Sequence, residues 1–487
     1  MTTKIILEVI KGQLKGKIFN FDERMTCIVG RSPKCNLRLP DDKAHAKASR
    51  YHCLLDINPP DIRIRDLGSL NGTYVNGQKI GQRPKNAKLK NKQSVQFFPE
   101  YDLRASDEIR IGETVFRIGV SMPGVCADCW EDIPEKDLEL SKIEENVYRC
   151  EQCRIKFVTT DQLPVPICPR CKFCGKDVTG KVRRRGDYVC GTCSKKPESI
   201  IQKLLSDAED GQTDLAALEG YTLKRMIGRG RIGAVYLAEN QKTGVLSALK
   251  IMIPMVSVGK EARERFLREI MLTGGLKHNH VIRLYDYGYY KGIFFFLQEV
   301  GEGGSIADAM RASGGTLPVD TAVKFINQLS DGLTYIHNVD MVHRDIKPVN
   351  LLLTNDRETA KISDCGLSKA FDAAGLSGLS MTGDLMGSPQ FMPRQQVINF
   401  KFARSEADVW ALAASLYNML TGAFPREFPT GKDPWSVIVT DQPVPILQRN
   451  NRLPEKLAAV IDTALVDKLE IAYKTAAELK TAIKEAL

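Results

Sequence analysis

Residues 343–350 read His-Arg-Asp-Ile-Lys-Pro-Val-Asn, and Asp-Cys-Gly follows at 364–366. This stretch places one carboxylate, Asp345, shortly before a side-chain amide, Asn350, and a second carboxylate, Asp364. Oxygen donors of this kind are the ligands that Mg²⁺ prefers, and a carboxylate beside them can accept a proton from a hydroxyl. The spacing therefore predicts a metal-assisted polar site in the carboxyl-terminal half of the chain.

A glycine-rich stretch lies upstream of this site. Residues 227–235 read Ile-Gly-Arg-Gly-Arg-Ile-Gly-Ala-Val and fit G-x-G-x-x-G-x-V, in which small residues let backbone N–H groups close over phosphates. Alone, such a pattern is often only a turn between strands. Here Ala-Leu-Lys follows at 248–250 at strand spacing, and Glu269 sits in the amphipathic run 261–276. Leu-Gln-Glu-Val at 297–300 completes five motifs in order.

These motifs resemble those of the bacterial Hanks-type (eukaryotic-like) serine/threonine protein kinases, over about residues 220–487. The resemblance implies an α+β bilobal domain that transfers the γ-phosphate of ATP to Ser or Thr hydroxyls. In that family's terms Asp345 would accept the hydroxyl proton, and Lys347 would steady the moving phosphate. Asn350, which belongs to the same catalytic loop, and Asp364 would bind Mg²⁺.

The resemblance also implies how ATP would be held. The hinge at 297–300 would bind adenine, and Glu269 would be the helical partner of Lys250. The residues implied to bind ATP are Gly228, Gly230, Gly233, Val235, Ala248, Lys250, Glu269, Glu299, Leu352 and Asp364.

Departures from the family pattern occur at two places. Cys365 stands where the family usually has Phe, so a smaller residue is expected beneath the long helix of the amino-terminal lobe. Residues 387–395 match G-T-P-x-Y-M-A-P-E, except that Arg394 and Gln395 replace the final Pro-Glu, and Ala472 aligns with the buried Arg that pairs with that Glu. Removing one partner of a buried pair costs about 3–5 kcal/mol, whereas removing both can be nearly neutral. The double loss favours an adjusted architecture.

The activation segment, residues 367–389, contains the hydroxyls of Ser377, Ser380 and Thr382. In the family, Arg344 receives a phosphate on such a residue. We therefore expect activation by autophosphorylation, with Thr382 and Ser380 as the candidate phosphosites.

The amino-terminal 120 residues have short alternating apolar runs separated by Gly, Pro and Asn turns, which predicts an all-β sandwich. Loop sequences at 30–32, 49–52 and 66–77 resemble those of forkhead-associated (FHA) domains, with a basic insertion at about 84–102. The resemblance implies phosphothreonine binding, for which guanidinium, hydroxyl and amide donors are suited. The implied phosphopeptide-binding residues are Arg31, Ser49, Arg50 and Asn71.

Nine of the thirteen cysteines fall between 126 and 193, and C-x-x-C knuckles in a reducing compartment indicate zinc rather than disulfides. One predicted zinc site comprises Cys126, Cys129, Cys150 and Cys153. A second uses Cys190 and Cys193 with either Cys168/Cys171 or Cys171/Cys174; the latter pair is preferred because Gly175 suits a knuckle turn. With so few apolar residues, the segment 121–195 is expected to be a zinc-ribbon-like module that needs metal to fold.

Composition limits the remaining possibilities. The first 120 residues hold 22 basic and 13 acidic side chains, so most of the formal +10 charge lies there, much of it in a basic stretch that reads as a solvated loop. The chain has no run of 18 apolar residues, and its first 20 residues contain charged side chains such as Lys4, Glu8, Lys11 and Lys15, which argues against a membrane span or a signal peptide. We expect a cytoplasmic protein without a membrane partner.

The sequence thus predicts a multidomain protein: FHA at 1–120, the double zinc module at 121–195, a linker with a short helix at 196–219, and the kinase at 220–487. Its expected cofactors are ATP, Mg²⁺ and Zn²⁺. Its expected partners are phosphothreonine proteins, itself among them, and Ser/Thr substrates. The alternative is a pseudokinase adaptor that presents the FHA and zinc modules to other proteins. A nucleic-acid role is a weaker third reading, because the module containing Arg183 to Arg185 is net acidic and poor in aromatics.

Overall fold

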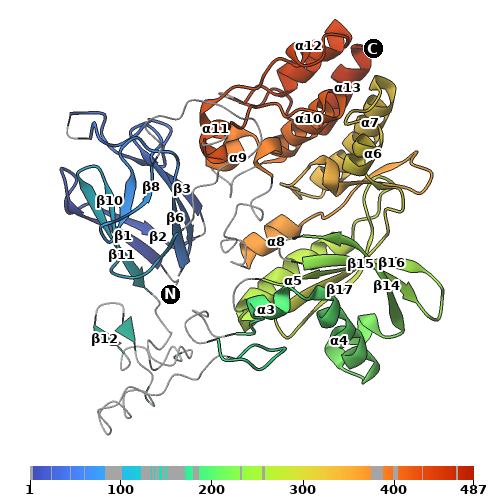
Figure 1. The fold of residues 1–487 in the computed structure, drawn as a ribbon, viewed down its shortest axis with the longest axis horizontal. Coiled ribbons are helices and arrows are strands. Elements are labelled where there is room, and N and C mark those ends of the chain that lie inside the picture. The colour runs from blue at the N-terminus through green and yellow to red at the C-terminus, as the bar shows by residue number, and fades with distance from the viewer. Residues whose placement is uncertain are drawn as a thin grey trace.

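The computed structural model describes most of residues 4–82, 101–121 and 170–487, with short pieces at 133, 137, 142–144, 147–148 and 151. The positions not described within the three ranges are 24, 44, 60, 179–185, 231–232, 255–257, 375–387, 399–403, 430–431 and 468–469. Figure 1 shows a β domain beside a helical lobe, with a mixed lobe below it. Among the described residues, no helix is both long and apolar enough to cross a bilayer.

The amino-terminal domain is the predicted all-β sandwich. Its six-stranded sheet has the order β2-β1-β11-β10-β7-β8 and its five-stranded sheet the order β4-β3-β5-β6-β9. The strands of the first sheet are β1 Lys4–Lys11, β2 Ile18–Phe21, β7 Thr73–Val75, β8 Gln78–Gly81, β10 Glu108–Ile111 and β11 Thr114–Ser121. Those of the second are β3 Met25–Gly30, β4 Leu37–Arg38, β5 Cys53–Asn58, β6 Asp61–Asp66 and β9 Tyr101–Leu103. Apolar side chains from both inner faces, such as Leu7 and Leu55, form the core.

The segment between the sandwich and the kinase domain is described in part, and its residues from Val189 to Leu218 pack onto the kinase domain. It contains β12 Lys142–Glu144, β13 Val147–Tyr148, α3 Gly191–Ser194, α4 Pro197–Glu209 and the 3₁₀ helix η2 Thr213–Leu218. Residues 196–219 were predicted to be a linker with a short helix, but in the structure they are part of the core of the kinase lobe. Ile201 and Leu204 of α4 and Leu218 of η2 are fully buried in one core with Leu249 and Phe295 of the kinase sheet. Apolar residues recurring at helical spacing in α4 give it this buried face.

The amino-terminal kinase lobe is a five-stranded antiparallel sheet in the order β14-β15-β16-β18-β17, with one long helix against it. The strands are β14 Tyr221–Arg229, β15 Gly233–Asn240, β16 Leu246–Met252, β17 Leu284–Tyr290 and β18 Ile293–Gln298; the helix is α5 Lys260–Gly274.

The carboxyl-terminal lobe is mainly helical and surrounds α7 and α10, whose buried faces meet in its core. Its helices are α6 Ile306–Ala312, α7 Val319–Asn338, α9 Arg394–Ile398, α10 Ser405–Thr421, α11 Pro434–Thr440, α12 Glu455–Ala464 and α13 Ala476–Glu485. The helix α8 Leu367–Ala373 packs against α5 of the amino-terminal lobe. The remaining elements are the strands β19 Gly304–Ser305, β20 Leu351–Leu353 and β21 Ala360–Ile362 and the 3₁₀ helices η3 Pro348–Asn350, η6 Pro389–Phe391 and η8 Ile446–Gln448.

The sandwich and the helical lobe share an apolar contact, which we call the docking cluster. The sandwich contributes Ile28, Cys35, Leu54 and Leu67, and the lobe contributes Met392, Val397, Trp435, Ile438 and Val439. Ile28 and Leu54 are opposite each other on β3 and β5, and both are buried although they point away from the sandwich core. The outer face of the second sheet is therefore covered by α9 and α11 (Figure 1).

Candidate functional site

The loop 343–350 brings its predicted catalytic side chains together. The Asn350 amide donates hydrogen bonds to the Asp345 carboxylate and to the Asp345 carbonyl, both at 2.8 Å. The Lys347 ammonium lies 2.9 Å from the same carboxylate. A carboxylate held by an amide and an ammonium has a fixed orientation, which a general base requires.

A buried carboxylate from another part of the chain holds this loop in place. Asp408, in the first turn of α10, accepts hydrogen bonds from the backbone N–H groups of His343 at 2.8 Å and Arg344 at 2.7 Å. The His337 ring contacts it at 2.9 Å. Burial opposes ionisation of Asp408, but these donors outweigh it and hold its pKa below the usual range. This residue was not predicted from the sequence, and its only signal is one acidic residue near the start of the mostly apolar stretch 407–420.

The predicted metal ligand and the predicted ATP lysine contact each other directly. The Lys250 ammonium lies 2.7 Å from the Asp364 carboxylate. Burial raises the pKa of Asp364, but the charge of Lys250 more than compensates and the pKa is lowered overall. The prediction that Glu269 pairs with Lys250 is not met in this structure, because Glu269 pairs with Lys369 of α8 at 3.0 Å.

Packing of α8 on α5 explains the exchange of partners. Phe371 of α8 packs edge-on against Phe266 of α5, with ring centroids 4.9 Å apart, and Ala370 and Ala374 lie in the same core cluster. This contact brings Lys369 to Glu269. Cys365, where the family has Phe, is buried in the core of the helical lobe.

The glycine loop and the hinge flank this charged pair. Gly230 donates its N–H to the Gly233 carbonyl at 3.0 Å. A side chain at Gly233 would collide with the Ile251 carbonyl, so the close approach of β15 to β16 requires glycine there. Val235 is partly exposed and Ala248 is buried on the same strands, β15 and β16.

The hinge residue Glu299 has partners for both its backbone and its carboxylate. Its N–H donates to the Arg283 carbonyl at 2.9 Å, and its carboxylate pairs with Lys361 at 2.5 Å. Leu352 lies directly against the hinge, because an added Cβ at Gly301 would lie 2.6 Å from the Leu352 Cβ. The predicted adenine-side residues therefore meet between the lobes.

A buried ion pair lies beside Arg394 and Gln395, the two residues that depart from the family motif. The Arg394 N–H donates to the Asp467 carboxylate at 2.8 Å, and the Arg426 guanidinium makes an ion pair with the same carboxylate. The Gln395 amide donates to the Asp467 carbonyl at 3.1 Å. A buried acid between two buried arginines thus anchors the start of α9. Asp467 and Arg426 were missed, because each is distant in sequence from the motif it supports.

The three predicted phosphopeptide loops meet at one end of the sandwich. The Leu70 N–H donates to the Ser49 hydroxyl at 3.0 Å, and the Asn71 amide donates to the Lys47 carbonyl at 2.8 Å. The Arg31 side chain donates to the Ala48 carbonyl at 2.7 Å. These contacts place Arg31, Ser49 and Asn71 on adjoining loops.

Charge at this end of the sandwich is only partly neutralised. Arg31 forms an ion pair with Asp41, whereas Arg50 is exposed. Buried Asp66 organises the neighbouring turn, because it accepts hydrogen bonds from the N–H groups of Gly68 and Ser69 at 2.8 Å each. A dianionic ligand would have to compete with Asp41 for the Arg31 guanidinium.

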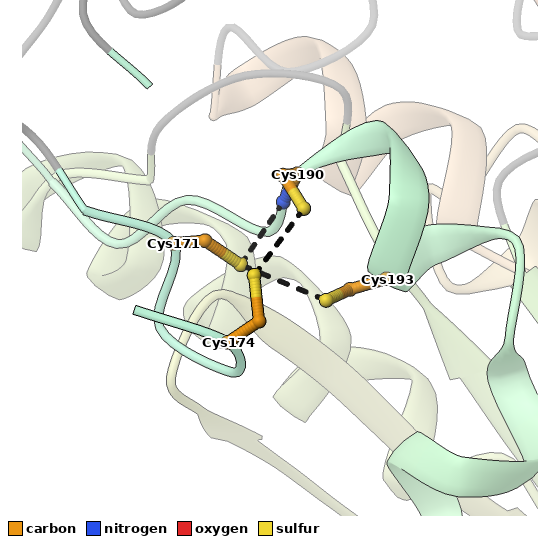
Figure 2. Close-up of side chains that lie close together, drawn as sticks. All are labelled: Cys171, Cys174, Cys190 and Cys193. Carbon is orange, nitrogen blue, oxygen red and sulfur yellow. Dashed lines mark hydrogen bonds between the residues drawn. The ribbon is translucent and has the colours of Figure 1, made fainter. Parts of the chain in front are cut away.

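Four cysteines converge beside the amino-terminal kinase lobe (Figure 2). Cys171, Cys174, Cys190 and Cys193 have Sγ atoms that all lie within 4.8 Å of one another. The Cys171–Cys193 and Cys174–Cys190 sulfur distances are 3.9 and 3.7 Å. Zn–S bonds of about 2.3 Å in a tetrahedron place the sulfurs roughly 3.8 Å apart, so this donor set fits zinc.

Hydrogen bonds lower the pKa of two of the four thiols, Cys171 and Cys190, whereas burial and the neighbouring cysteines raise the pKa of Cys193. The Cys190 N–H donates to the Cys171 sulfur at 3.3 Å (Figure 2). Burial raises the pKa of the Cys190 thiol, but hydrogen bonds from Cys193 and Cys171 outweigh it and lower that pKa to about 6. Thiolates at neutral pH are the form that binds metal. Of the two alternatives for this cluster, the structure brings together the set containing Cys174.

Several predicted residues lie outside the described part of the chain. They are Cys126, Cys129, Cys150, Cys153, Cys168, Ser377, Ser380 and Thr382.

Comparisons with known proteins agree with this geometry. The protein kinase domain model matches residues 221–470, a little over half of the chain, and the FHA domain model matches residues 27–98. Relatives include the serine/threonine-protein kinases PknJ of Mycobacterium bovis (31% identical over 275 residues, 55% of this chain and 45% of the relative) and PknH of Mycobacterium tuberculosis (32% over 284 residues, 58% and 44%).

The chain spans about half the length of these curated relatives. A solved structure, the Mycobacterium tuberculosis PknI kinase domain, is 23% identical, covers 55% of this chain and 96% of its own, and has a TM-score of 0.44. With the kinase model matched over more than half of its length, the chain belongs to the protein kinase family and is homologous to serine/threonine protein kinases.

Proposed function

We propose that the chain is an active serine/threonine protein kinase that transfers the γ-phosphate of ATP to protein hydroxyls, including its own. One observation carries the proposal: Asp345 is held by Asn350 and Lys347 on a loop that buried Asp408 anchors. A pseudokinase has no need for a base so closely supported, and Lys250 and Asp364 are both retained.

In this proposal each residue has one task. Asp345 accepts the proton of the substrate hydroxyl as that oxygen attacks phosphorus, and Lys347 stabilises the negative charge of the moving phosphate. Lys250 and the glycine loop at 228–233 hold the phosphates of ATP. Mg²⁺, when bound through the oxygens of Asn350 and Asp364, would neutralise phosphate charge.

We further propose that the described arrangement is a resting one. Lys250 and Glu269 each pair with another residue, so the lysine is not yet braced by the helix α5. Phosphorylation of Ser380 or Thr382 would supply a dianion for Arg344 and reorganise the segment that contains Lys369. In a pseudokinase adaptor, Lys250 and Glu269 would remain unpaired with each other permanently. Their present pairing with Asp364 and Lys369 is therefore the observation that favours this second candidate function.

The sandwich is proposed to bind phosphothreonine through Arg31, Ser49, Arg50 and Asn71. The convergence of their loops supports this role. The domain boundaries 1–120, 121–195 and 220–487 are proposed with it, and α4 and η2 are assigned to the kinase lobe because they share its core.

Incubation of the full-length chain with labelled ATP and Mg²⁺ tests catalysis. We expect label on Ser or Thr within 367–389, and Asp345→Asn should lower incorporation by about 100-fold or more because it removes the base. Asp340→Asn is the matched control, since Asp340 is exposed and has a positive φ that Asn tolerates. A wild-type protein that takes up no label with any divalent metal would leave only the adaptor function.

Binding of a peptide spanning 376–388, with and without phosphate on Thr382, tests the sandwich. Loss of charge-assisted hydrogen bonds in Arg31→Ala or Ser49→Ala should weaken binding by about 10- to 100-fold. Arg38→Ala, which removes an exposed arginine of the same domain, should leave affinity unchanged. Equal affinity for the two peptides would contradict phosphate recognition.

A further inference from the structure

The four-cysteine cluster is joined to the kinase lobe by a strand-like backbone contact. Between the two knuckles, the Asp187 N–H donates to the Val258 carbonyl at 3.0 Å and the Val258 N–H donates to the Asp187 carbonyl at 2.8 Å. The two residues form an antiparallel bridge. Gly186 has a φ of 147°, and a Cβ there would lie 2.5 Å from the Val258 carbonyl. Only glycine allows this approach.

The Asp187 side chain contacts both the kinase lobe and the first knuckle. Its carboxylate accepts a hydrogen bond from the Tyr289 hydroxyl at 2.9 Å and pairs with Lys172 of the first knuckle at 3.0 Å. The Tyr289 ring in turn receives the Arg263 guanidinium, 5.5 Å from its centroid. Arg263 lies in the first turns of α5, so one chain of contacts runs from the knuckle to this helix.

The bridge lies immediately before α5. Val258 is buried with Phe266 and Ile270 of that helix, and Gly259 is its N-cap, whose carbonyl accepts the Arg263 N–H at 3.0 Å. The same helix carries Glu269. The backbone direction at Val258 therefore sets where α5 begins and how it approaches the sheet.

A second contact reaches the nucleotide side of the lobe. The Arg229 guanidinium donates to the Lys195 carbonyl, two residues after Cys193, at 2.8 Å. Arg229 is the last residue of β14 and belongs to the glycine loop. The glycine loop thus contacts the cysteine module directly, and α5 is linked to it through Val258 and through Tyr289.

We propose that a zinc ion bound by Cys171, Cys174, Cys190 and Cys193 positions α5 and the glycine loop, with Asp187 as the positioning residue that transmits the constraint. The expected effect of this positioning on ATP binding rests on the proposed kinase function. The ion holds the two knuckles, and the knuckles present residues 186–190 to Val258. Val189 is buried in the kinase-lobe core and Tyr188 packs with Val178 in a small apolar cluster, so the zinc ion adds its constraint to these contacts by fixing the two knuckles relative to each other.

Zinc removal from the full-length protein provides the first test. Backbone hydrogen exchange at Val258 and in the first turns of α5 should become at least about 10-fold faster after chelation and return to its original rate when Zn²⁺ is added back. Exchange in α12 and α13 of the helical lobe should not change. Unchanged exchange at Val258, with metal loss verified by metal analysis, would overturn the proposal.

Cysteine variants separate this site from the other predicted one. Cys190→Ser with Cys193→Ser should reproduce the effect of chelation on α5, whereas Cys126→Ser with Cys129→Ser should leave exchange at Val258 slow. If both pairs of variants accelerate exchange equally, the effect belongs to the whole module and not to this site.

Asp187 variants test transmission while the ligands stay intact. Asp187→Ala should retain zinc, speed exchange at Val258 and raise the KM for ATP more than it lowers kcat, while Asp187→Asn, whose amide oxygen can still accept from Tyr289, should restore most of both. Equal behaviour of the two variants would contradict the positioning role. Hydrogen exchange needs no turnover, so its result does not depend on whether the chain transfers phosphate.

Discussion

The kinase domain is held by two neighbouring modules in different ways. The cysteine module reaches the amino-terminal lobe through the backbone pairing of Asp187 with Val258 and the hydroxyl of Tyr289. The FHA domain contacts the carboxyl-terminal lobe through the docking cluster, which is made of apolar side chains around Trp435. The first contact depends on direction and geometry, and the second on buried apolar area.

This difference implies different responses to change. Hydrogen-bonded contacts contribute about 1 kcal/mol each and fail when geometry fails, whereas apolar contacts scale with area and tolerate small shifts. The first is suited to setting the position of a helix, and the second to keeping a domain in place. Substitutions in the two contacts should therefore separate positioning from attachment.

The largest effect is expected at the centre of the docking cluster. Trp435 is 1% exposed, so Trp435→Ala should lower the free energy of unfolding by about 3–5 kcal/mol and release the FHA domain. Release should be visible as faster alkylation of Cys35, which the cluster buries. Trp410→Ala is the control, because Trp410 belongs to the core of the lobe and not to the docking cluster. Slow Cys35 alkylation in Trp435→Ala would show that the attachment does not depend on this side chain.

A smaller effect is expected from a carboxylate at the same contact. Burial raises the pKa of Asp433, the N-cap of α11, to about 6, although the charge of Arg65 opposes the rise. A folded-state pKa above the unfolded value of 3.8 means that the folded protein holds a proton there more tightly. This contribution is full below pH 4 and is lost as the pH rises through 6. The loss is on the order of 3 kcal/mol at most.

Asp433→Asn should therefore be more stable than the wild type at pH 7 and exceed it by much less at pH 4.5, because Asn retains the capping oxygen without the charge. Urea midpoints at the two pH values measure this. Asp441→Asn, which removes a carboxylate paired with Lys432, is the control for loss of charge alone. If the wild type and Asp433→Asn differ equally at both pH values, the buried carboxylate is not the cause.

The two contacts also mark the limit of what the sequence predicts. The catalytic set is predictable because Asp345, Lys347 and Asn350 lie within one short loop, so their spacing fixes their proximity. Asp408 and Asp467 act from other parts of the chain: Asp408 is marked only as an acid in a mostly apolar stretch, and nothing local marks Asp467 as an anchor. The partner of Glu269 could not be predicted, because it depends on whether α8 packs against α5.

The strands that contribute to the docking cluster have a recognisable sequence pattern, but the structure is needed to interpret it. β3 contains Cys27-Ile28-Val29 and β5 contains Leu54-Leu55, without the polar alternation of a strand that has one wet face. Continuous apolar strands are buried on both faces. Residues 196–219 were interpreted as a linker for a related reason. The polar residues of α4 are evident in the sequence, whereas the function of its narrow apolar face is evident only when the structure shows that this face packs against the kinase sheet.

The smallest effect is expected where one hydroxyl joins the cysteine module to the kinase lobe. Tyr289→Phe removes the hydrogen bond to Asp187 and keeps the ring, so it should lower the free energy of unfolding by only about 1 kcal/mol. Tyr290→Phe is the matched control, because its hydroxyl donates to Asp207 of α4 at 3.0 Å, away from the bridge. The two variants should lose similar global stability, but only Tyr289→Phe should speed hydrogen exchange at Val258. If both variants leave exchange at Val258 equally slow, the backbone bridge between Asp187 and Val258 holds α5 without the Tyr289 hydroxyl. The contact of the cysteine module with the kinase lobe would then tolerate single substitutions as well as the docking cluster does.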